Sequence, residues 1–594
     1  MFSWLKKRWH AAEENRRIKL SGNSRGESSP PIESTAQGID YKNAGDKYFD
    51  LGKYTEAAAN YRLAIDCNPD FAEAHNNLGG VCREQNLPDK AEHHLREAIR
   101  LKPGFANFHY NLASLLMDQG RLNEAIEHFG KAVTHKPAHY AARAIMTLLL
   151  QKTCQWADLK SNIDALRNSV YTTTEFAESV FSPFVFISLP GTTLEEQKLC
   201  AEKWARAEYQ GFAALRRNLA FDHRRPRSGK ITIGYLSADL REHPVARMMA
   251  EVFARHNREQ FHITAYSYGP HDGSQMRKRL HNAFDHFVDI RAHSDIDAAM
   301  RIYADKINIL VDLTGYTANS RSGILALRPA PFQLNYLGYQ ATMGADFVDY
   351  LIADHFLVAP DQQRHCTEKI LYLPNCFQPN DSTRPRLPAP SRASCGLSDN
   401  SFVFCCFNQT YKITPEVFDI WCRLLIAVPD SILWLFASTS FSEENLRREA
   451  SSRGVEPARL VMAPSLVPVE HLARIQCADL FLDTTPVNAG TTCGDALWMG
   501  LPLVTYAGET FPSRMAGSLL STLGVPELIT YNLQDYYRLA LSLATDRIKL
   551  AAIRSKIVAN RATSPLFDNA LFTRNLEDLY VKLLDNASGD AIPL

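Results

Sequence analysis

The feature that most limits the possible folds of this chain is an internal repeat with a period of 34 residues. The same residue types recur at this interval at four positions: Pro69, Pro103 and Pro137; Ala57, Ala91 and Ala125; Ala64, Ala98 and Ala132; Tyr61, Leu95 and Phe129. Small residues let two antiparallel helices approach closely, and proline ends a helix because it cannot continue the hydrogen-bond ladder. The pattern therefore predicts three helix–turn–helix units that stack into a solenoid.

The spacing within each unit, A-x3-[FYL]-x2-A-x4-P, resembles the tetratricopeptide repeat. Repeats of that type form a concave groove that binds segments of other proteins. We therefore expect three repeats over residues 39–137, with a protein partner in their groove. The alternative is a solenoid whose units only pack against one another.

The segments on either side of the repeats have a different composition. Residues 1–38 are expected to be a disordered tail and linker, because Ser, Gly and Pro dominate their second half. Trp4, Lys6, Lys7 and Trp9 suggest a weak membrane contact by residues 1–20, and a frayed basic tail is the alternative. Residues 138–228 are expected to be a helical connector.

Composition excludes several classes of protein. The 594 residues include 65 Lys and Arg against 65 Asp and Glu, and this balance argues against a nucleic-acid partner. The twelve cysteines contain no C-x-x-C pair, which favours a reducing, cytoplasmic setting. No run approaches the roughly 20 apolar residues of a membrane-spanning helix.

After residue 229, short apolar runs alternate with helical segments. The expected strands lie near residues 230–234, 261–266 and 307–313, and then near 402–407, 431–436, 460–462, 480–483 and 503–506. This alternation predicts parallel sheets with crossover helices. We expect two Rossmann-like α/β lobes, residues 229–385 and 386–594, with a ligand cleft at the carboxyl ends of their strands.

Two expected strands of the second lobe are followed by polar residues suited to a phosphate ligand. Gln409 and Lys412 follow the first of these strands, and a surface turn is the alternative for this short segment. After the 480–483 strand, Gly490 precedes Thr491 and Thr492 at an expected helix start, where free amides favour a phosphate. Asp495, one turn later, is placed to bind ribose hydroxyls. Ordinary capping of a buried helix is the alternative.

In the first lobe, His243 follows the first strand and precedes Pro244 at a helix start. The positive end of a helix dipole disfavours the imidazolium, so a neutral His243 can act as a base or as a hydrogen-bond partner near a reacting hydroxyl. An N-capping histidine is the alternative. Asp295 and Asp297 have the D-x-D spacing of some metal sites, but their position at a helix start favours capping.

Several longer strings, in the same order, resemble glycosyltransferase family 41, which includes O-GlcNAc transferases and SPINDLY-like proteins. They are IGYLSADLREHPVARMM, DLTGYTANSRSGILALRPAPFQLNYLGYQATMGADFVDYLIAD, FNQTYKI, LDTTPVNAGTTCGDALWMGLPLVT, GETFPSRMAGS and RATSPLFD. The resemblance implies the GT-B arrangement of two lobes. It also implies metal-independent, inverting transfer of a sugar from a nucleotide sugar to Ser or Thr of a protein acceptor bound through the repeats, without a cofactor.

The resemblance also implies residue roles. The catalytic positions are His243, Lys412, which would stabilise the departing nucleotide, and His286, which would lie near acceptor and sugar. The nucleotide-sugar-binding positions are Gln409 for the diphosphate, His471 for the nucleobase, Thr491 and Thr492 for phosphate, and Asp495 for the ribose.

Two departures from the pattern of the animal enzymes lie at the expected nucleotide. Gly490 stands where those enzymes have His, and Pro468 stands where they have Lys. We expect UDP-GlcNAc as donor, with SPINDLY-like O-fucosyl transfer from GDP-fucose as the alternative. N-linked hexosyl transfer to Asn and a catalytically weak repeat scaffold are further alternatives.

Overall fold

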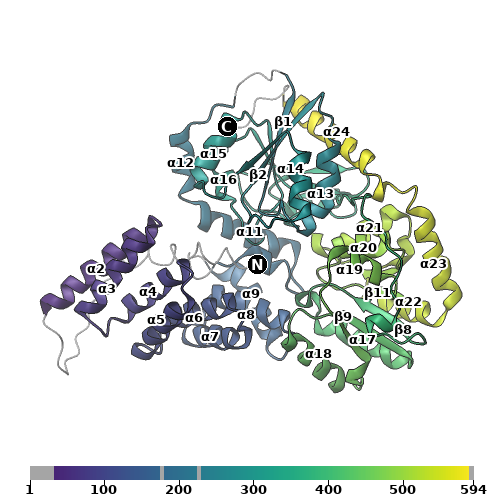
Figure 1. Ribbon diagram of the computed structural model, residues 1–594, viewed down its shortest axis with the longest axis horizontal. Coiled ribbons are helices and arrows are strands. Elements are labelled where there is room, and N and C mark those ends of the chain that lie inside the picture. Colours follow the sequence, from purple (N-terminus) through teal and green to yellow (C-terminus); the bar gives the residue numbers. More distant parts are fainter. Residues whose placement is uncertain (1–31, 174–179, 224–228, 588–594) are drawn as a thin grey trace. The chain divides into compact units, whose positions relative to one another are not determined.

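The computed structural model describes residues 32–173, 180–223 and 229–587, which form two compact units (Figure 1). The first unit contains the repeats up to Leu149 and the segment Asp164–Phe181. The second contains Leu150–Ile163 and the chain from Ser182 onward. The expected tail, including the proposed membrane contact by residues 1–20, lies outside the described residues.

The first unit is a series of antiparallel helix pairs. Its helices are α2 (Ile32–Asp50), α3 (Tyr54–Cys67), α4 (Ala72–Glu84), α5 (Pro88–Leu101), α6 (Ala106–Asp118) and α7 (Leu122–His135), followed by α8 (Tyr140–Lys152) and α9 (Leu159–Thr172). A Cβ added at Gly79 would lie 2.7 Å from Leu95 Cγ, so the small and large positions of the repeat pack directly on each other. The predicted repeats are therefore present as helix pairs. Helix α2 begins at Ile32, seven residues before the expected start.

The expected connector is divided between the two units. Residues 150–163 belong to the second unit, as do α10 (Pro183–Phe186), α11 (Leu194–Tyr209) and α12 (Phe212–Leu219). Thr410 Oγ1 donates a hydrogen bond to the carbonyl of Lys152 at 2.7 Å, and Asn445 Nδ2 donates to that of Thr153 at 2.7 Å. Because of these bonds, the end of α8 anchors the loop that carries Gln409 and Lys412.

The first lobe is built on a seven-stranded parallel sheet with the order β3-β2-β1-β4-β5-β6-β7. Its strands are β1 (Ile231–Ser237), β2 (Phe261–Ser267), β3 (His286–Asp289), β4 (Ile309–Asp312), β5 (Phe332–Asn335), β6 (Tyr350–Asp354) and β7 (Lys369–Leu373). Its helices are α13 (Pro244–Arg255), α14 (Gln275–Ala283), α15 (Asp295–Ala304) and α16 (Gly323–Ala326).

The second lobe has a six-stranded parallel sheet with the order β10-β9-β8-β11-β12-β13. Its strands are β8 (Phe402–Cys406), β9 (Ser431–Phe436), β10 (Leu460–Ala463), β11 (Leu480–Leu482), β12 (Leu503–Tyr506) and β13 (Ile529–Thr530). Its helices are α17 (Pro415–Ala427), α18 (Ser440–Ser452), α19 (Pro468–Ile475), α20 (Thr491–Trp498), α21 (Met515–Leu523), α22 (Leu533–Thr545) and α23 (Arg547–Asn560).

The last helix, α24 (Asn569–Ala587), returns to the first lobe and packs on α13 (Figure 1). Glu577 pairs with His256 Nδ1 at 3.0 Å, and the Tyr580 and Tyr235 hydroxyls lie 3.2 Å apart. The chain therefore crosses between the lobes twice, once through the segment near residues 377–394 and once before α24.

The predicted fold class is correct: a helical repeat region precedes two parallel-sheet lobes. Every strand expected from an apolar run is present. Strands β3, β5, β6, β7 and β13 were not expected. Strand β5 shows why, because its sequence FQLN includes Gln333 and Asn335, which are buried and hydrogen-bonded instead of apolar.

Candidate active site

The sheet order of each lobe defines one point at which loops diverge. In the first lobe the chain passes from β1 outward to β3 and returns to β4 on the other side of β1, and in the second lobe β8 and β11 have the same relationship. Ligands of open α/β sheets bind at such switch points. His243 follows β1, Lys412 follows β8 and Thr491 follows β11, so most of the expected site residues lie at these two points.

Lys412 lies in a short 3-10 turn, Thr410–Lys412, directly after β8. Its Nζ donates a hydrogen bond to the carbonyl of Asn488 at 3.1 Å, in the loop after β11. The Asn488 side chain is held in turn by the carbonyl of Thr484 at 2.7 Å. Burial lowers the pKa of Lys412, while nearby Asp483 and Cys406 oppose this shift. The result is a cation fixed at the switch point.

Asp483, which sequence reasoning missed, organises the loop that faces Lys412. Its carboxylate accepts bonds from the backbone amides of Thr484 and Ala489, each at 2.8 Å, and from the Thr505 hydroxyl at 2.7 Å. Burial raises the pKa of Asp483 to about 6, and its hydrogen bonds and Lys412 oppose the increase. A buried acid at the end of β11 was the available sequence signal.

Helix α20 begins at Thr491, directly after Gly490. Gly490 supplies no side chain to cap the helix, so the first amides of α20 lack that partner, and Thr491 and Thr492 are half-buried beside them. The Thr491 hydroxyl lies 3.6 Å from Met248 Sδ on α13 of the first lobe. The amino end of α20 thus faces the other lobe with the features that a phosphate site requires.

Asp495 forms an ion pair with Arg384, which comes from the segment that joins the lobes. Burial raises the pKa of Asp495, and Arg384 and Arg247 oppose the increase. Arg384 also lies over the Trp498 ring, 5.4 Å from its centroid. A ribose at Asp495 would therefore share this carboxylate with Arg384, a partner that the sequence did not reveal.

His243 is the N-cap of α13, as the capping alternative predicted. Its Nδ1 accepts a hydrogen bond from the Val245 amide at 3.3 Å, and its Nε2 lies 3.6 Å from Asp239 Oδ1. Burial, together with Arg241 and Arg247, lowers the pKa of His243 to about 4, so the ring is neutral at pH 7. Because Nδ1 accepts, Nε2 carries the hydrogen, and this tautomer suits a hydrogen-bond donor better than a base.

His471 lies on α19, where its Nδ1 faces two nitrogens of Arg474 at 2.9 and 3.1 Å. Its ring meets Phe407 edge-on, with centroids 5.2 Å apart. Burial and then Arg474 and Arg247 lower the pKa of His471 to about 4. The neutral, fixed ring at the end of β8 has the properties needed to pack against a nucleobase.

Arg247 is a second residue that sequence reasoning missed. It lies one turn after His243 on α13, and its Nε donates to Glu242 Oε1 at 2.6 Å. Its charge lowers the pKa of His243, His471 and Asp495, so it lies near both lobes' site residues. Its position four residues after His243 was the signal available in the sequence.

Two expected residues do not join this group in the same way. His286 is the first residue of β3, exposed at the amino edge of the sheet, whereas His243 follows the carboxyl end of β1. Parallel strands place these two ends on opposite edges, so the structure does not support a catalytic role for His286. Gln409 does precede Lys412 in the site loop, but its side chain is exposed and has no recorded hydrogen-bond partner.

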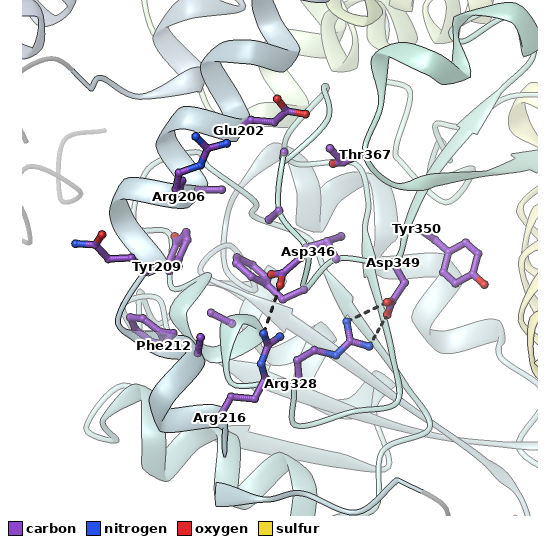
Figure 2. Close-up of a pocket in the computed structure, with 18 of the residues that line it drawn as sticks. Glu202, Arg206, Tyr209, Phe212, Arg216, Arg328, Asp346, Asp349, Tyr350 and Thr367 are labelled. Carbon is purple, nitrogen blue, oxygen red and sulfur yellow. Dashed lines mark hydrogen bonds and ion pairs between the residues drawn. The ribbon is translucent and has the colours of Figure 1, made fainter. Parts of the chain in front are cut away.

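A cavity of about 790 Å³ lies at the other edge of the first lobe's sheet, between α11, α12 and the amino ends of β5, β6 and β7 (Figure 2). Two ion pairs cross it: Arg328 with Asp349 at 2.9 Å, and Arg216 with Asp346 at 3.4 Å. None of the expected site residues lines this cavity. It is therefore separate from the switch-point residues.

The D-x-D segment is a helix cap. Asp297 completes a capping box with Ser294, and Asp295 pairs with Arg321 at 2.8 Å. Among the described residues, no group of three or more His, Cys, Asp and Glu side chains is arranged to hold a metal ion. In the same part of the chain, no helix is both long and apolar enough to cross a bilayer.

The fold and the site define a two-lobed α/β protein with a phosphate-type site at the strand switch points, preceded by helical repeats. Comparison with known families gives a matching result. The profile of glycosyltransferase family 41 matches residues 154–385 and 380–576, and tetratricopeptide profiles match residues 45–86 and 83–149. The chain belongs to glycosyltransferase family 41.

Individual relatives have the same organisation. The chain is 38% identical over 362 residues to a probable UDP-N-acetylglucosamine–peptide N-acetylglucosaminyltransferase, SEC, of Arabidopsis thaliana, covering 60% of this chain and 37% of that protein. It is 31% identical over 463 residues to the Caenorhabditis elegans UDP-N-acetylglucosamine–peptide N-acetylglucosaminyltransferase, covering 59% and 40%. It spans about two fifths of the length of these curated relatives.

A solved structure matches nearly the whole chain. A Lys-to-Met mutant of Thermobaculum terrenum O-GlcNAc transferase superposes with a TM-score of 0.65 at 26% identity, covering 94% of this chain and 99% of the other. The similarity therefore extends over both the repeats and the lobes.

Proposed function

We propose that the protein is an inverting, metal-independent protein O-glycosyltransferase that moves GlcNAc from UDP-GlcNAc to Ser or Thr of a protein acceptor. The observation that carries this proposal is the placement of Lys412 at the switch point, held by Asn488 and close to the uncapped start of α20. Family membership supports the same reaction class.

In the proposed reaction, the acceptor hydroxyl oxygen attacks the anomeric carbon as the bond from that carbon to the diphosphate oxygen breaks. Negative charge develops on the departing diphosphate, and the hydroxyl proton leaves the acceptor. Lys412 and the first amides of α20 stabilise the diphosphate without a metal or a cofactor. A fixed cation of this kind contributes on the order of 3–4 kcal/mol to lowering the barrier.

His243 is proposed to orient the acceptor or the donor through its Nε2 hydrogen, since its Nδ1 is engaged by the Val245 amide. Asp495 with Arg384, His471 with Phe407, and Thr491 with Thr492 are proposed to bind the ribose, the nucleobase and the phosphates. Gln409 is proposed to join the diphosphate contacts from its exposed position. The repeats are proposed to hold the protein acceptor.

The cellular setting is proposed to be the cytoplasm. All twelve cysteines are free thiols in the structure, and most of them are buried. Free thiols at this number are typical of a reducing compartment.

Transfer of fucose from GDP-fucose is the second candidate. Gly490 and Pro468 lie at the proposed nucleotide positions and differ from the animal pattern, and SPINDLY-named proteins are among the relatives. Titration calorimetry with UDP and with GDP separates the two donors. A clear preference for UDP supports the first proposal, and a clear preference for GDP supports the second.

Lys412→Ala tests the reaction itself. Wild-type protein given labelled UDP-GlcNAc should release UDP or transfer sugar, and Lys412→Ala should lose nearly all of this activity while still binding UDP. Normal turnover in the variant would contradict the proposed leaving-group role. No turnover of any nucleotide sugar by the wild type would favour a repeat scaffold.

A further inference from the structure

Two successive repeats each contain a pair of facing histidines. His75 on α4 and His94 on α5 place their Nδ1 atoms 3.2 Å apart, and His109 on α6 and His128 on α7 place theirs 3.1 Å apart. The second pair lies 34 residues after the first at both positions. The arrangement is therefore a property of the repeat and not of one local contact.

One histidine of each pair is fixed by a backbone carbonyl. Nε2 of His75 lies 3.0 Å from the Pro69 carbonyl, and Nε2 of His109 lies 2.9 Å from the Pro103 carbonyl. A carbonyl only accepts, so each Nε2 carries the hydrogen and each Nδ1 presents a free lone pair to its partner ring. Metal-bound histidines typically donate their second ring N–H to a carbonyl in this way.

The partner imidazoles are neutral under ordinary conditions. Burial, together with nearby positive charge, lowers the pKa of His94 and of His128 to about 4, and burial also lowers that of His109. Both rings of a metal-binding pair must be neutral, because a protonated ring nitrogen has no lone pair to donate.

The spacing of the nitrogens fits a shared ion. Two nitrogens at about 2.0–2.1 Å from a tetrahedral ion lie about 3.3 Å apart. The observed separations are slightly shorter, and the ring centroids of the pairs lie 5.4 and 5.3 Å apart. A small outward rotation of one ring is enough to open each pair around an ion.

We propose that each pair binds one divalent transition-metal ion between its two Nδ1 atoms, with water completing the coordination. The hydrogen now shared between the Nδ1 atoms leaves, and the partner ring takes a proton on Nε2, so the pair stays neutral as the ion enters. Imidazole ligands with open water positions favour Cu²⁺ over Ni²⁺ and Zn²⁺. Each ion would clip the two helices of one repeat together.

The neighbouring repeats predict how many ions bind. The first repeat has Tyr41 and Asn60 at the two positions, and the position after His109 in the series is Arg143, whose guanidinium donates to the Pro137 carbonyl at 3.3 Å. Neither place offers two imidazoles. The expected number of these sites is therefore two for each chain.

The test uses the full chain with CuCl2 or NiCl2 at pH 7.5, with bound metal counted by equilibrium dialysis. His94→Asn and His128→Asn introduce the residue that the first repeat has naturally, and far-ultraviolet circular dichroism checks that each variant is folded. We expect each variant to lose one of the tightly bound ions and the double variant to lose both. His93→Asn, an exposed neighbour outside the pairs, is the control and should lose none.

Two readouts separate chelation from a structural hydrogen bond. Cu²⁺ bound to the wild type should show nitrogen hyperfine splitting in electron paramagnetic resonance that disappears in the double variant. Metal should also raise the Tm of the wild type but not that of the double variant. An unchanged count of tightly bound ions in the double variant would show that the pairs are hydrogen-bonded histidines only.

Discussion

Lys412 Nζ donates a hydrogen bond to the carbonyl oxygen of Asn488 at 3.1 Å, and this bond links the loops that follow β8 and β11. Because α20 begins three residues after Asn488, the same contact holds the lysine near the start of that helix. A cation and a set of helix amides are thus brought together at one switch point. The proposed stabilisation of a departing diphosphate depends on this relationship.

Replacing Lys412 tests that stabilisation quantitatively. Lys412→Ala should lower kcat by roughly 10²–10³-fold, because a preorganised charge at the leaving group is lost. Single-turnover kinetics measures this, and Lys556→Ala is the matched control, since Lys556 is an exposed lysine paired with Glu527 on the surface. Equal activity in the two variants would be inconsistent with the assigned role.

The two histidines of the first lobe should behave differently. His243→Ala should remove most activity, because this ring lies at the carboxyl end of β1. His286→Ala should leave kcat/KM within about twofold of wild type, since His286 lies at the amino edge of the sheet. Side-by-side kinetics decides the matter, and a large loss in His286→Ala would mean that the amino edge takes part in the reaction.

The pH dependence follows from the lowered pKa of His243 and His471. Both rings have a pKa of about 4 in the folded protein and titrate near 6.5 when unfolded. The unfolded state therefore takes up more protons between those values, so the free energy of unfolding should fall as the pH drops from about 6.5 to about 4. Urea titrations across this range measure it, and His243→Gln should show a smaller loss.

Arg247 should influence both lobes' histidines at once. Arg247→Ala removes a positive charge that lowers the pKa of His243 and His471, so both values should rise. Titration of the histidine ring signals by NMR checks this, with the exposed Arg538→Ala as control. If only the His243 value moves, Arg247 does not face the second lobe as described.

Two glycines of the α20 region should tolerate alanine differently. A Cβ at Gly490 would meet the terminal methyl of Met515, which can move, so Gly490→Ala should cost less than about 1 kcal/mol. A Cβ at Gly494 would meet the Asn380 side-chain oxygen. The amide of Asn380 is fixed by the carbonyls of Gln378 and Leu566, so we expect about 2–3 kcal/mol there. Denaturant unfolding ranks the two variants, and the reverse order would contradict this packing.

Much of the fold could be predicted from local patterns, since the 34-residue period and the apolar runs report buried faces directly. The strands that escaped prediction are short, and β5 contains buried polar residues whose partners lie in other segments. Gln333 bonds to the carbonyls of Leu325 and Phe347, for example. A single sequence does not show that a polar residue will find such partners.

The expected site shows the same division. His243, Lys412 and Thr491 could be placed because each follows a recognisable strand or precedes a recognisable helix. Arg384 could not, because its pairing with Asp495 joins positions 111 residues apart through a segment without regular structure. His286 was misplaced because β3 was not predicted, and only the position of that strand shows which edge the residue occupies.

The central claim is that this chain transfers a sugar from a nucleotide to protein hydroxyls through the Lys412 site. The most direct measurement incubates purified full-length protein with labelled UDP-GlcNAc and, separately, GDP-fucose, together with a cell extract, and locates modified residues by mass spectrometry. We predict a GlcNAc mass increment on Ser or Thr residues from UDP-GlcNAc that is absent with Lys412→Ala. Modification that persists unchanged in Lys412→Ala, or no modification from any nucleotide sugar, would contradict the account.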